Sequence, residues 1–369
     1  MVYPADRFAA WPPLAARLMV LGIVLILLAS SLAPTEPTVR PTGLGTSART
    51  GAAASMGDER DPDLVLYDRI IARVARGEAY YGAAVDEQRR GNYPVRPGPA
   101  VRLPTLAYLE ALLGKSGSRI AAMLLFAATL VAWWQRLGVE PGGPAQRRIA
   151  VALLVPGAAL ILNPRYLVVH ETWAGMLLLL SLGLHRAGGR EGRRWVAAWV
   201  AAALALTIRE LALPYVLLMA AMALSRRQWR EAGAWIALAI AFVGLLVIHV
   251  GLIAPHVTDA DPPSSSWIAM RGLHGWLRNI AMSSSLHFLP GWIAGPLVIL
   301  MLLGWAGWRT AAGGFATLLY IGYGLLFMIA GRSDNFYWGA LVAPGMFMGL
   351  AFVPRALTSL WRNAMNHAA

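Results

Sequence analysis

Several apolar segments of this chain begin or end at a pair of opposite charges. The pairs are Arg165 with Glu171, Arg209 with Glu210, and, within the stretch GRSDNFYWG, Arg332 with Asp334. A carboxylate can accept or deliver a proton, and an arginine fork can hold a phosphate group. Ionisable groups at the ends of membrane spans mark functional sites when they face the interior of the bundle. We therefore treat these residues as candidate substrate-binding residues.

Each of these charges also has a structural explanation. Glu171 can complement the N-terminal dipole of an apolar helix, and Arg165 can anchor a helix end at the membrane interface. Adjacent residues of a helix do not face each other, so we expect no salt bridge between Arg209 and Glu210.

The stretch GRSDNFYWG presents the same choice between structure and function. Asp334 precedes an apolar run, and an aspartate there can cap the exposed amides of a helix. Arg332 cannot cap a helix in this way, and its guanidinium group needs an anionic partner because it lies beside apolar segments. The sequence leaves Asp334, another carboxylate and a substrate phosphate open for that role. The aromatic residues that follow, FYW, are typical of an interfacial belt.

Composition identifies the environment in which these charges must be placed. The chain has 369 residues, of which 57% are hydrophobic and 14% are charged. This balance is typical of a bundle of membrane-spanning helices and not of a soluble domain. Much of the formal charge of +13 lies in short arginine clusters between apolar runs, which favours membrane orientation over nucleic-acid binding. The sequence has no cysteine and no histidines at metal-ligand spacing, so we expect no metal site.

About ten apolar runs approach the length needed to cross the hydrocarbon core as helices. We expect an all-α polytopic transmembrane bundle that forms a single integral-membrane domain over 1–369. The expected spans are 14–33, 118–135, 149–163, 171–185, 195–208, 211–224, 232–253, 291–307, 311–330 and 337–353. A cleaved signal peptide is the alternative for the first run, but Pro34 directly after its small residues disfavours cleavage.

Arginine clusters predict the orientation of this bundle. Alternate connections carry the arginines, and with ten spans these clusters all fall on one side. Short basic loops are cytoplasmic, so we expect both termini inside the cell. The paired charges and the long first loop, 34–117, then lie on the extracytoplasmic face. In that loop we expect a flexible linker over 34–57 and surface helices over 63–76 and 104–113.

The first loop contains a series of elements with a recognisable order. Two acidic residues, Asp61 and Asp63, precede the expected surface helix, and they are followed by Tyr80-Tyr81, Tyr93-Pro94 and Arg102-Leu103-Pro104. This arrangement resembles the GT-C superfamily of integral-membrane glycosyltransferases, in particular the bacterial branch that acts on polyprenyl-phosphate sugars. The architecture resembles that family over nearly the whole chain, whereas the motif match covers about residues 61–110.

The resemblance implies a glycosyltransferase of the bacterial cytoplasmic (inner) membrane whose active face is extracytoplasmic. It implies a polyprenyl-phosphate sugar donor held in membrane lipid, a glycan, lipid or protein acceptor, and no nucleic acid. Asp63 and Asp61 become the candidate catalytic residues, and Arg102 joins the arginines that would bind the donor phosphate. A longer segment separates the first span from Asp61 than in many relatives, so the family acid is one of Asp61, Asp63 and Asp68. Many relatives use a divalent cation, and the cofactor stays open because the sequence offers no convincing ligand cluster.

Physical requirements agree with the resemblance. Nucleotide sugars are absent outside the cytoplasm, so a transferase there needs a lipid-carried donor, and cations must stabilise the departing phosphate. A transporter or flippase for a lipid-linked or anionic substrate is the main alternative, followed by a membrane assembly factor and an acyltransferase. The sequence has no paired Gly/Pro-broken segments in matching halves, which would point to a transport site. The lack of cysteine and of paired histidines disfavours an acyltransferase.

Overall fold

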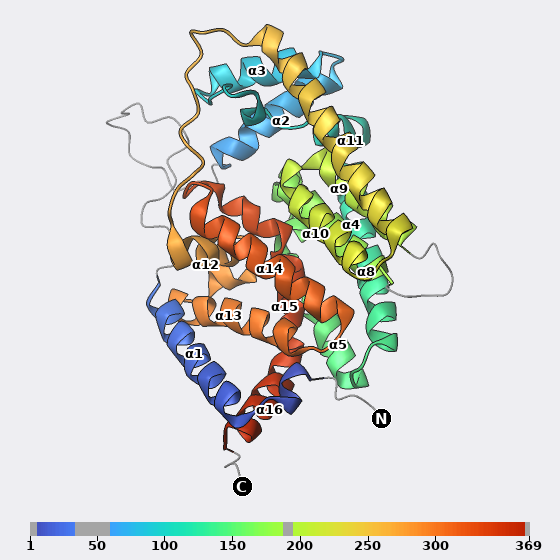
Figure 1. The fold of residues 1–369 in the computed structure, drawn as a ribbon. Helices are drawn as coiled ribbons and strands as arrows, with labels where there is room; N and C mark the ends of the chain where they lie inside the picture. The colour runs from blue at the N-terminus through green and yellow to red at the C-terminus, as the bar shows by residue number, and fades with distance from the viewer. Residues whose placement is uncertain (1–5, 34–59, 187–194, 366–369) are drawn as a thin grey trace.

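The computed structural model describes residues 6–33, 60–186 and 195–365, and within these ranges the chain is helical. Figure 1 shows a bundle with α2 (Pro62–Ala75) and α3 (Tyr80–Arg90) at one end and α16 (Val353–Met365) at the other. The linker predicted over 34–57 lies outside the described residues. The prediction of an all-α fold is confirmed for the part of the chain that the structure describes.

Four helical stretches of the described residues are long and apolar enough to cross a membrane. They are α1 (Pro13–Leu32), Gly98–Val139 with α4 (Thr105–Val139), Trp229–His256 with α11 (Trp229–Ile253), and α14 (Ala311–Ile329). A fifth is present if the pair Asn335–Leu341 and Ala343–Met365, bent by 54°, is one span. These apolar helices indicate a membrane protein. The predicted count of about ten spans is not confirmed, because several helices at the expected positions are shorter than the hydrocarbon core requires.

Shorter apolar helices fill the middle of the bundle. They are α8 (His170–Leu184), α9 (Val196–Ile208), α10 (Leu213–Ser225) and α13 (Gly291–Gly307). Helix α8 is buried on nearly every side, as expected for a helix that is apolar all round, and it packs against α4 and α9. Short 3-10 helices join the longer elements: η1 (Arg7–Ala10), η2 (Gly98–Ala100), η3 (Pro164–Tyr166), η4 (Glu210–Ala212), η5 (Ala254–His256) and η6 (Ser285–Phe288).

Two of the predicted spans are not continuous helices. Around Pro156, which has no amide hydrogen for the helix ladder, the chain forms α5 (Pro144–Ala152), α6 (Leu154–Gly157) and α7 (Ala159–Leu162). The last predicted span is replaced by η7 (Asn335–Leu341), α15 (Ala343–Phe347) and η8 (Met348–Phe352), which lead into α16. A further helix, α12 (Gly272–Met282), lies between α11 and α13, in the connection between the predicted spans 232–253 and 291–307.

The predicted surface helices form a unit at one end of the bundle. Helix α2 confirms the helix expected over 63–76, and α3, which was not expected, packs against it. The helix expected over 104–113 is the first part of α4, which breaks at Gly114. The φ of 64° at this glycine lies in the left-handed region that other residues rarely adopt. The break lets the start of α4 pack on α2 while the rest continues as an apolar span.

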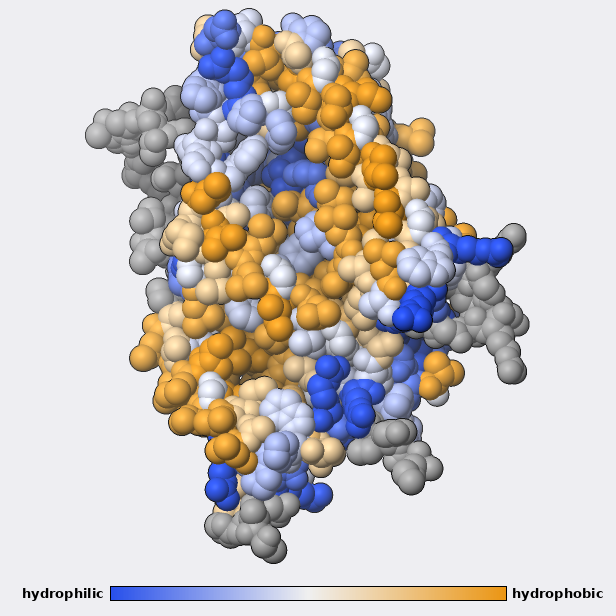
Figure 2. All heavy atoms as spheres, in the orientation of Figure 1, coloured by the Kyte–Doolittle hydropathy of each residue, from blue (hydrophilic) through white to orange (hydrophobic). Residues whose placement is uncertain are grey.

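Apolar side chains cover much of the outer surface, as a surface that faces lipid requires. Figure 2 shows them over much of the face drawn in Figure 1, together with a hydrophilic hollow between α11 and the end that holds α2 and α3. On α11 the exposed apolar residues include Val243, Val247 and Ile248. Figure 2 also shows hydrophilic residues in the lower half of this view, towards α16, so polar groups are present towards both ends of the bundle.

Candidate functional site

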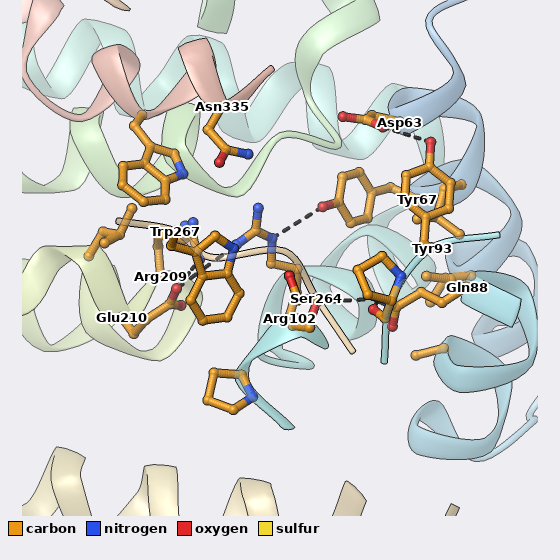
Figure 3. Close-up of a pocket in the computed structure, with 18 of the residues that line it drawn as sticks. Asp63, Tyr67, Gln88, Tyr93, Arg102, Arg209, Glu210, Ser264, Trp267 and Asn335 are labelled. Carbon is orange, nitrogen blue, oxygen red and sulfur yellow. Dashed lines mark hydrogen bonds and ion pairs between the residues drawn. The ribbon is translucent and has the colours of Figure 1, made fainter. Parts of the chain in front are cut away.

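A cavity of about 270 Å³ lies between the α2–α3 unit and the rest of the bundle. Figure 3 shows Arg102 near its centre, with Tyr67 and Trp267 beside it. Residues from several distant segments form its walls, and those predicted as catalytic or substrate-binding are Asp63, Arg102, Arg209, Glu210 and Arg332. The fold therefore brings together residues that the sequence places hundreds of positions apart.

Asp63 stands in the first turn of α2 and lines the cavity. The hydroxyl of Tyr93 donates a 2.6 Å hydrogen bond to Oδ1 of Asp63 (Figure 3). Burial raises the pKa of the Asp63 carboxyl above its usual range; the charges of Asp61 and Asp334 add to this, while the Tyr93 hydrogen bond and Arg102 oppose it. Among the described residues, Oδ2 of Asp63 has no hydrogen-bond partner. A carboxylate with a raised pKa and one open oxygen is suited to accept a proton.

Asp61 has a structural role. Its Oδ1 accepts the amide hydrogen of Asp63 at 2.9 Å and so caps the N-terminus of α2. Its Oδ2 accepts a 3.0 Å hydrogen bond from the hydroxyl of Tyr337. Asp68 is the third candidate for the family acid. Its Oδ2 lies 2.6 Å from Nε of Arg60, and the residue does not line the cavity. The geometry therefore favours Asp63 as the acid with access to a substrate.

Two arginines and two glutamates form a network on the bundle side of the cavity. Nε of Arg209 lies 2.7 Å from Oε1 of Glu171, and these side chains are 1% and 4% exposed. Arg209 also contacts the carboxylate of Glu210 through its terminal nitrogen. Nη2 of Arg102 lies 3.8 Å from Oε1 of Glu171, and Nη1 lies 3.9 Å from Oε1 of Glu210. Nε of Arg102 donates to the Tyr67 hydroxyl at 3.1 Å. Each glutamate is thus shared by both arginines.

The contact between Arg209 and Glu210 shows that the prediction of no salt bridge was wrong. That prediction assumed that the two residues are part of one helix. Arg209 instead has extended dihedral angles, φ −146° and ψ 117°, at the break between α9 and η4. The expectation for Glu171 is confirmed in part, because it lies in the first turn of α8, where a carboxylate complements the helix dipole. It also holds Arg209.

Two arginines of the α12 region hold the GRSDNFYWG segment in place. Arg271 donates to the carbonyl oxygens of Gly331 at 3.3 Å and Arg332 at 3.2 Å. Arg278 donates to the carbonyl oxygen of Ser333. Gly331 has a φ of 88°, a conformation that favours glycine. The segment is therefore a fixed turn that sets the side chain of Arg332 at the cavity wall. No pattern in the sequence indicated that Arg271 and Arg278 bind the backbone of the GRSDNFYWG segment.

The side chain of Arg332 makes only long contacts with described residues. Its Nε lies 3.4 Å from Oδ1 of Asp334, and Nη1 lies 3.3 Å from the hydroxyl of Ser264 and 3.4 Å from the carbonyl oxygen of Ser265. The prediction that Asp334 caps the next helix was wrong, since it precedes η7 without a side-chain cap hydrogen bond. Asn335 accepts the amide hydrogen of Arg332 at 3.0 Å instead.

Aromatic residues supply much of the site that the sequence did not reveal. The interpretation of the FYW run as an interfacial belt was wrong for Tyr337 and Trp338, which are 9% and 8% exposed and pack inside the structure. Tyr67 and Trp267 line the cavity, and neither was predicted. Trp267 belongs to an irregular Ser/Pro-rich segment before α12, where no periodicity indicates which side chains turn inward. Tyr93 belongs to the Tyr-Pro element, but its bond to Asp63 depends on the fold.

Arg165 and a divalent cation have no place in this cavity. Arg165 lies in η3, is exposed, and does not line the cavity. The described residues contain no group of three His, Asp or Glu side chains that could hold a metal ion. Both oxygens of Asp61 are already engaged. Glu210, which lines the cavity together with Asp63, already has its carboxylate in contact with Arg209 and Arg102. The described residues therefore do not fit a divalent cation.

The arrangement can accept a proton at Asp63 and bind an anion at Arg102 and Arg332 within one cavity. Aromatic rings around these groups can pack against an organic substrate. No family model, no curated protein and no solved structure matches this chain.

Proposed function

We propose that this protein is an integral-membrane glycosyltransferase that moves a sugar from a polyprenyl-phosphate donor to an extracytoplasmic acceptor. One observation carries the proposal: a single cavity contains the partly open carboxylate of Asp63 together with the guanidinium groups of Arg102 and Arg332. Glycosyl transfer from a lipid phosphate needs both a base for the acceptor hydroxyl and cations for the departing phosphate. The elements quoted from residues 61–110 supply the resemblance to the GT-C superfamily.

Asp63 is the proposed general base. The acceptor hydroxyl oxygen attacks the anomeric carbon of the donor sugar while the bond from that carbon to the phosphate oxygen breaks. The hydroxyl proton passes to Asp63, and the electron pair of the broken bond leaves with polyprenyl phosphate. The raised pKa of the Asp63 carboxyl makes its ionised form a stronger base for this transfer. One carboxylate is sufficient for a direct displacement.

Arg102 and Arg332 are the proposed phosphate-binding residues. Arg102 lies 3.8 and 3.9 Å from its two glutamates, and Arg332 lies 3.4 Å from Asp334. Arg209, at 2.7 Å from Glu171 and 1% exposed, is held more tightly. A charge-assisted bond to phosphate is short and strong, so the two loosely held arginines gain most from a phosphate in the cavity. Arg209, Glu171 and Glu210 then keep Arg102 in position.

The proposed orientation places the cavity outside the cytoplasm. The α2–α3 end with the cavity lies opposite α16 and η1, which are near the two ends of the described chain (Figure 1). The side-chain amide of Asn363 donates to the carbonyl oxygen of Phe8 at 2.7 Å, so α16 and η1 lie side by side. If the arginine-rich connections are cytoplasmic, the cavity faces the side where only lipid-carried sugars are available. The proposed location is the bacterial inner membrane.

A transfer assay with purified protein tests the proposal. The protein is incubated with radiolabelled polyprenyl-phosphate sugars and with glycan and lipid fractions as acceptors, and labelled product and released polyprenyl phosphate are measured. We expect transfer by the wild type, none by Asp63→Asn, and nearly full activity for the matched control Asp68→Asn, which changes an acid outside the cavity. Flux of the donor across proteoliposomes with no transfer would identify a transporter instead.

A further inference from the structure

Helix α16 has a buried apolar face that attaches it to the bundle. The members of this face are Val353, Ala356, Leu360 and Ala364. Ala356, Leu360 and Ala364 share one buried cluster with residues of α1 and α13, and α16 also packs on η1. Arg17 donates from Nε to the carbonyl oxygen of Ala364 at 2.7 Å. These contacts hold α16 against α1, α13 and η1 at this end of the bundle.

A second apolar face of α16 is exposed. Leu357, Trp361 and Met365 are 40%, 61% and 57% exposed, and their spacing of four residues places them along one side of the helix. Exposed apolar residues on the spans face lipid, but α16 also carries Arg355 and Arg362 and is much less apolar than α1 or α14. A two-faced helix that is only weakly apolar as a whole lies at the membrane interface and not in the hydrocarbon core.

The charges around α16 are predominantly positive. Arg355 and Arg362 are seven residues apart, so they lie two turns apart on one side, and both are exposed. Arg7 and Arg17 on the neighbouring η1 and α1 are exposed as well. Of the acidic residues near this end that the structure describes, Asp6 is buried and accepts the amide hydrogen of Phe8, and Glu140 lies 3.4 Å from Nε of Arg136. Charge complementarity therefore favours an anionic surface against α16.

We infer that α16 lies at the bilayer interface and binds anionic phospholipids. Leu357, Trp361 and Met365 lie against acyl chains just below the head groups, and Arg355 and Arg362 bind the phosphodiester groups of those lipids. Long arginine side chains can reach the head-group level from a helix whose apolar stripe is inserted. Each arginine near an anionic surface contributes attraction that strengthens binding severalfold. This inference does not depend on the proposed transferase activity.

The absence of cysteine from the chain allows a direct test of depth. Single-cysteine variants of the full-length protein, Leu357→Cys, Met365→Cys and Arg355→Cys, are labelled with a nitroxide and placed in vesicles with 30% phosphatidylglycerol in phosphatidylcholine. Residues 355 and 357 point to nearly opposite sides of the helix. We expect labels at 357 and 365 to favour collision with oxygen and the label at 355 to favour a water-soluble nickel complex. The inference would be overturned if the nickel complex reached the labels at all three positions equally. It would also be overturned if a protein partner shielded the labels at 357 and 365 from both oxygen and the nickel complex.

Lipid preference is tested with the double variant Arg355→Gln/Arg362→Gln. The relative binding of phosphatidylglycerol over phosphatidylcholine is measured with spin-labelled lipids on the reconstituted protein. We expect the preference to fall about fivefold for each arginine removed. The matched control is Arg69→Gln/Arg76→Gln, which removes the same charge from α2 and its C-cap at the opposite end. Equal preference in the wild type and the α16 variant, or an equal loss in the control, would refute the lipid contact.

Discussion

Tyr93 and Asp63, 30 residues apart in the sequence, share a 2.6 Å hydrogen bond at the wall of the cavity. The bond places a neutral donor on one oxygen of the proposed base and leaves its other oxygen toward the cavity. It also favours the charged form of a carboxyl whose pKa burial raises. Tyr93 thus sets both the direction and the basicity of Asp63.

Asp63→Asn is expected to remove transfer without loss of folding. General-base catalysis contributes about 10²–10⁴-fold, and the amide cannot accept the proton. Its oxygen can still accept the Tyr93 hydrogen bond. Because the folded-state pKa of Asp63 is raised, the stability from this group is present below its unfolded pKa and is lost as the pH rises through the folded value. At neutral pH the variant should therefore unfold at the wild-type temperature or above it. A clear drop in that temperature would contradict the assignment.

Tyr93→Phe is expected to shift the pH profile of transfer. The rate should rise with pH as Asp63 loses its proton, and removal of a hydrogen bond that favours the ionised form raises that pKa further. The acidic limb of kcat/KM should therefore move to higher pH. Tyr81→Phe is the matched control, because the Tyr81 hydroxyl bonds to His249 and not to Asp63. An unchanged acidic limb in Tyr93→Phe would show that Asp63 is not the titrating base.

Asp61 variants should separate capping from catalysis. Asn is as good an N-cap as Asp, so Asp61→Asn should keep both its stability and most of its activity. Asp61→Ala removes the acceptor for the amide of Asp63 and leaves the Tyr337 hydroxyl without this partner. We expect a loss of about 1–2 kcal/mol in the free energy of unfolding, measured in detergent. Loss of transfer in stable Asp61→Asn would instead make Asp61 the base.

A double-mutant cycle on Arg332 and Asp334 distinguishes substrate binding from structure. Their 3.4 Å contact is partly exposed, so a coupling energy below about 1 kcal/mol is expected in unfolding experiments. Arg332→Gln should weaken binding of the donor lipid by about 1.5–3 kcal/mol, the usual scale for a charged hydrogen bond. Strong coupling in stability with unchanged donor affinity would reduce the GRSDNFYWG segment to a structural turn.

Arg209→Gln should be the most destabilising of the arginine changes considered. Arg209 is 1% exposed, and its loss leaves the buried carboxylate of Glu171 with only the more distant Arg102. Breaking one side of a buried pair costs about 3–5 kcal/mol in the free energy of unfolding. The double variant Arg209→Gln/Glu171→Gln should recover part of this loss. Mild destabilisation by the single change would contradict a buried structural pair.

Many residues of the site could be predicted from their type and position in the sequence. Which of these side chains contact one another could not be predicted. Charges at the ends of apolar runs are visible in the sequence because burying them is costly, so they were sound candidates. Arg209, Glu210 and Arg332 do line one cavity, whereas Arg165 has the same sequence signature and does not. Arg102, which also lines the cavity, became a candidate through the resemblance. Periodicity located α2 but not the breaks that place Arg209 beside Glu210, since these breaks depend on packing against neighbouring helices.

The sequence by itself indicated a membrane protein and determined the helical fold and the strong bias of arginine among its charges, because these follow from composition and local hydrogen bonding. Only the tertiary structure decided which acid is open to the cavity. Asp61 and Tyr337 are 276 residues apart, and their hydrogen bond exists because α2 and η7 meet at one end of the bundle. Partners of a buried polar group are set by which segments pack together, and no local pattern in the chain records that contact.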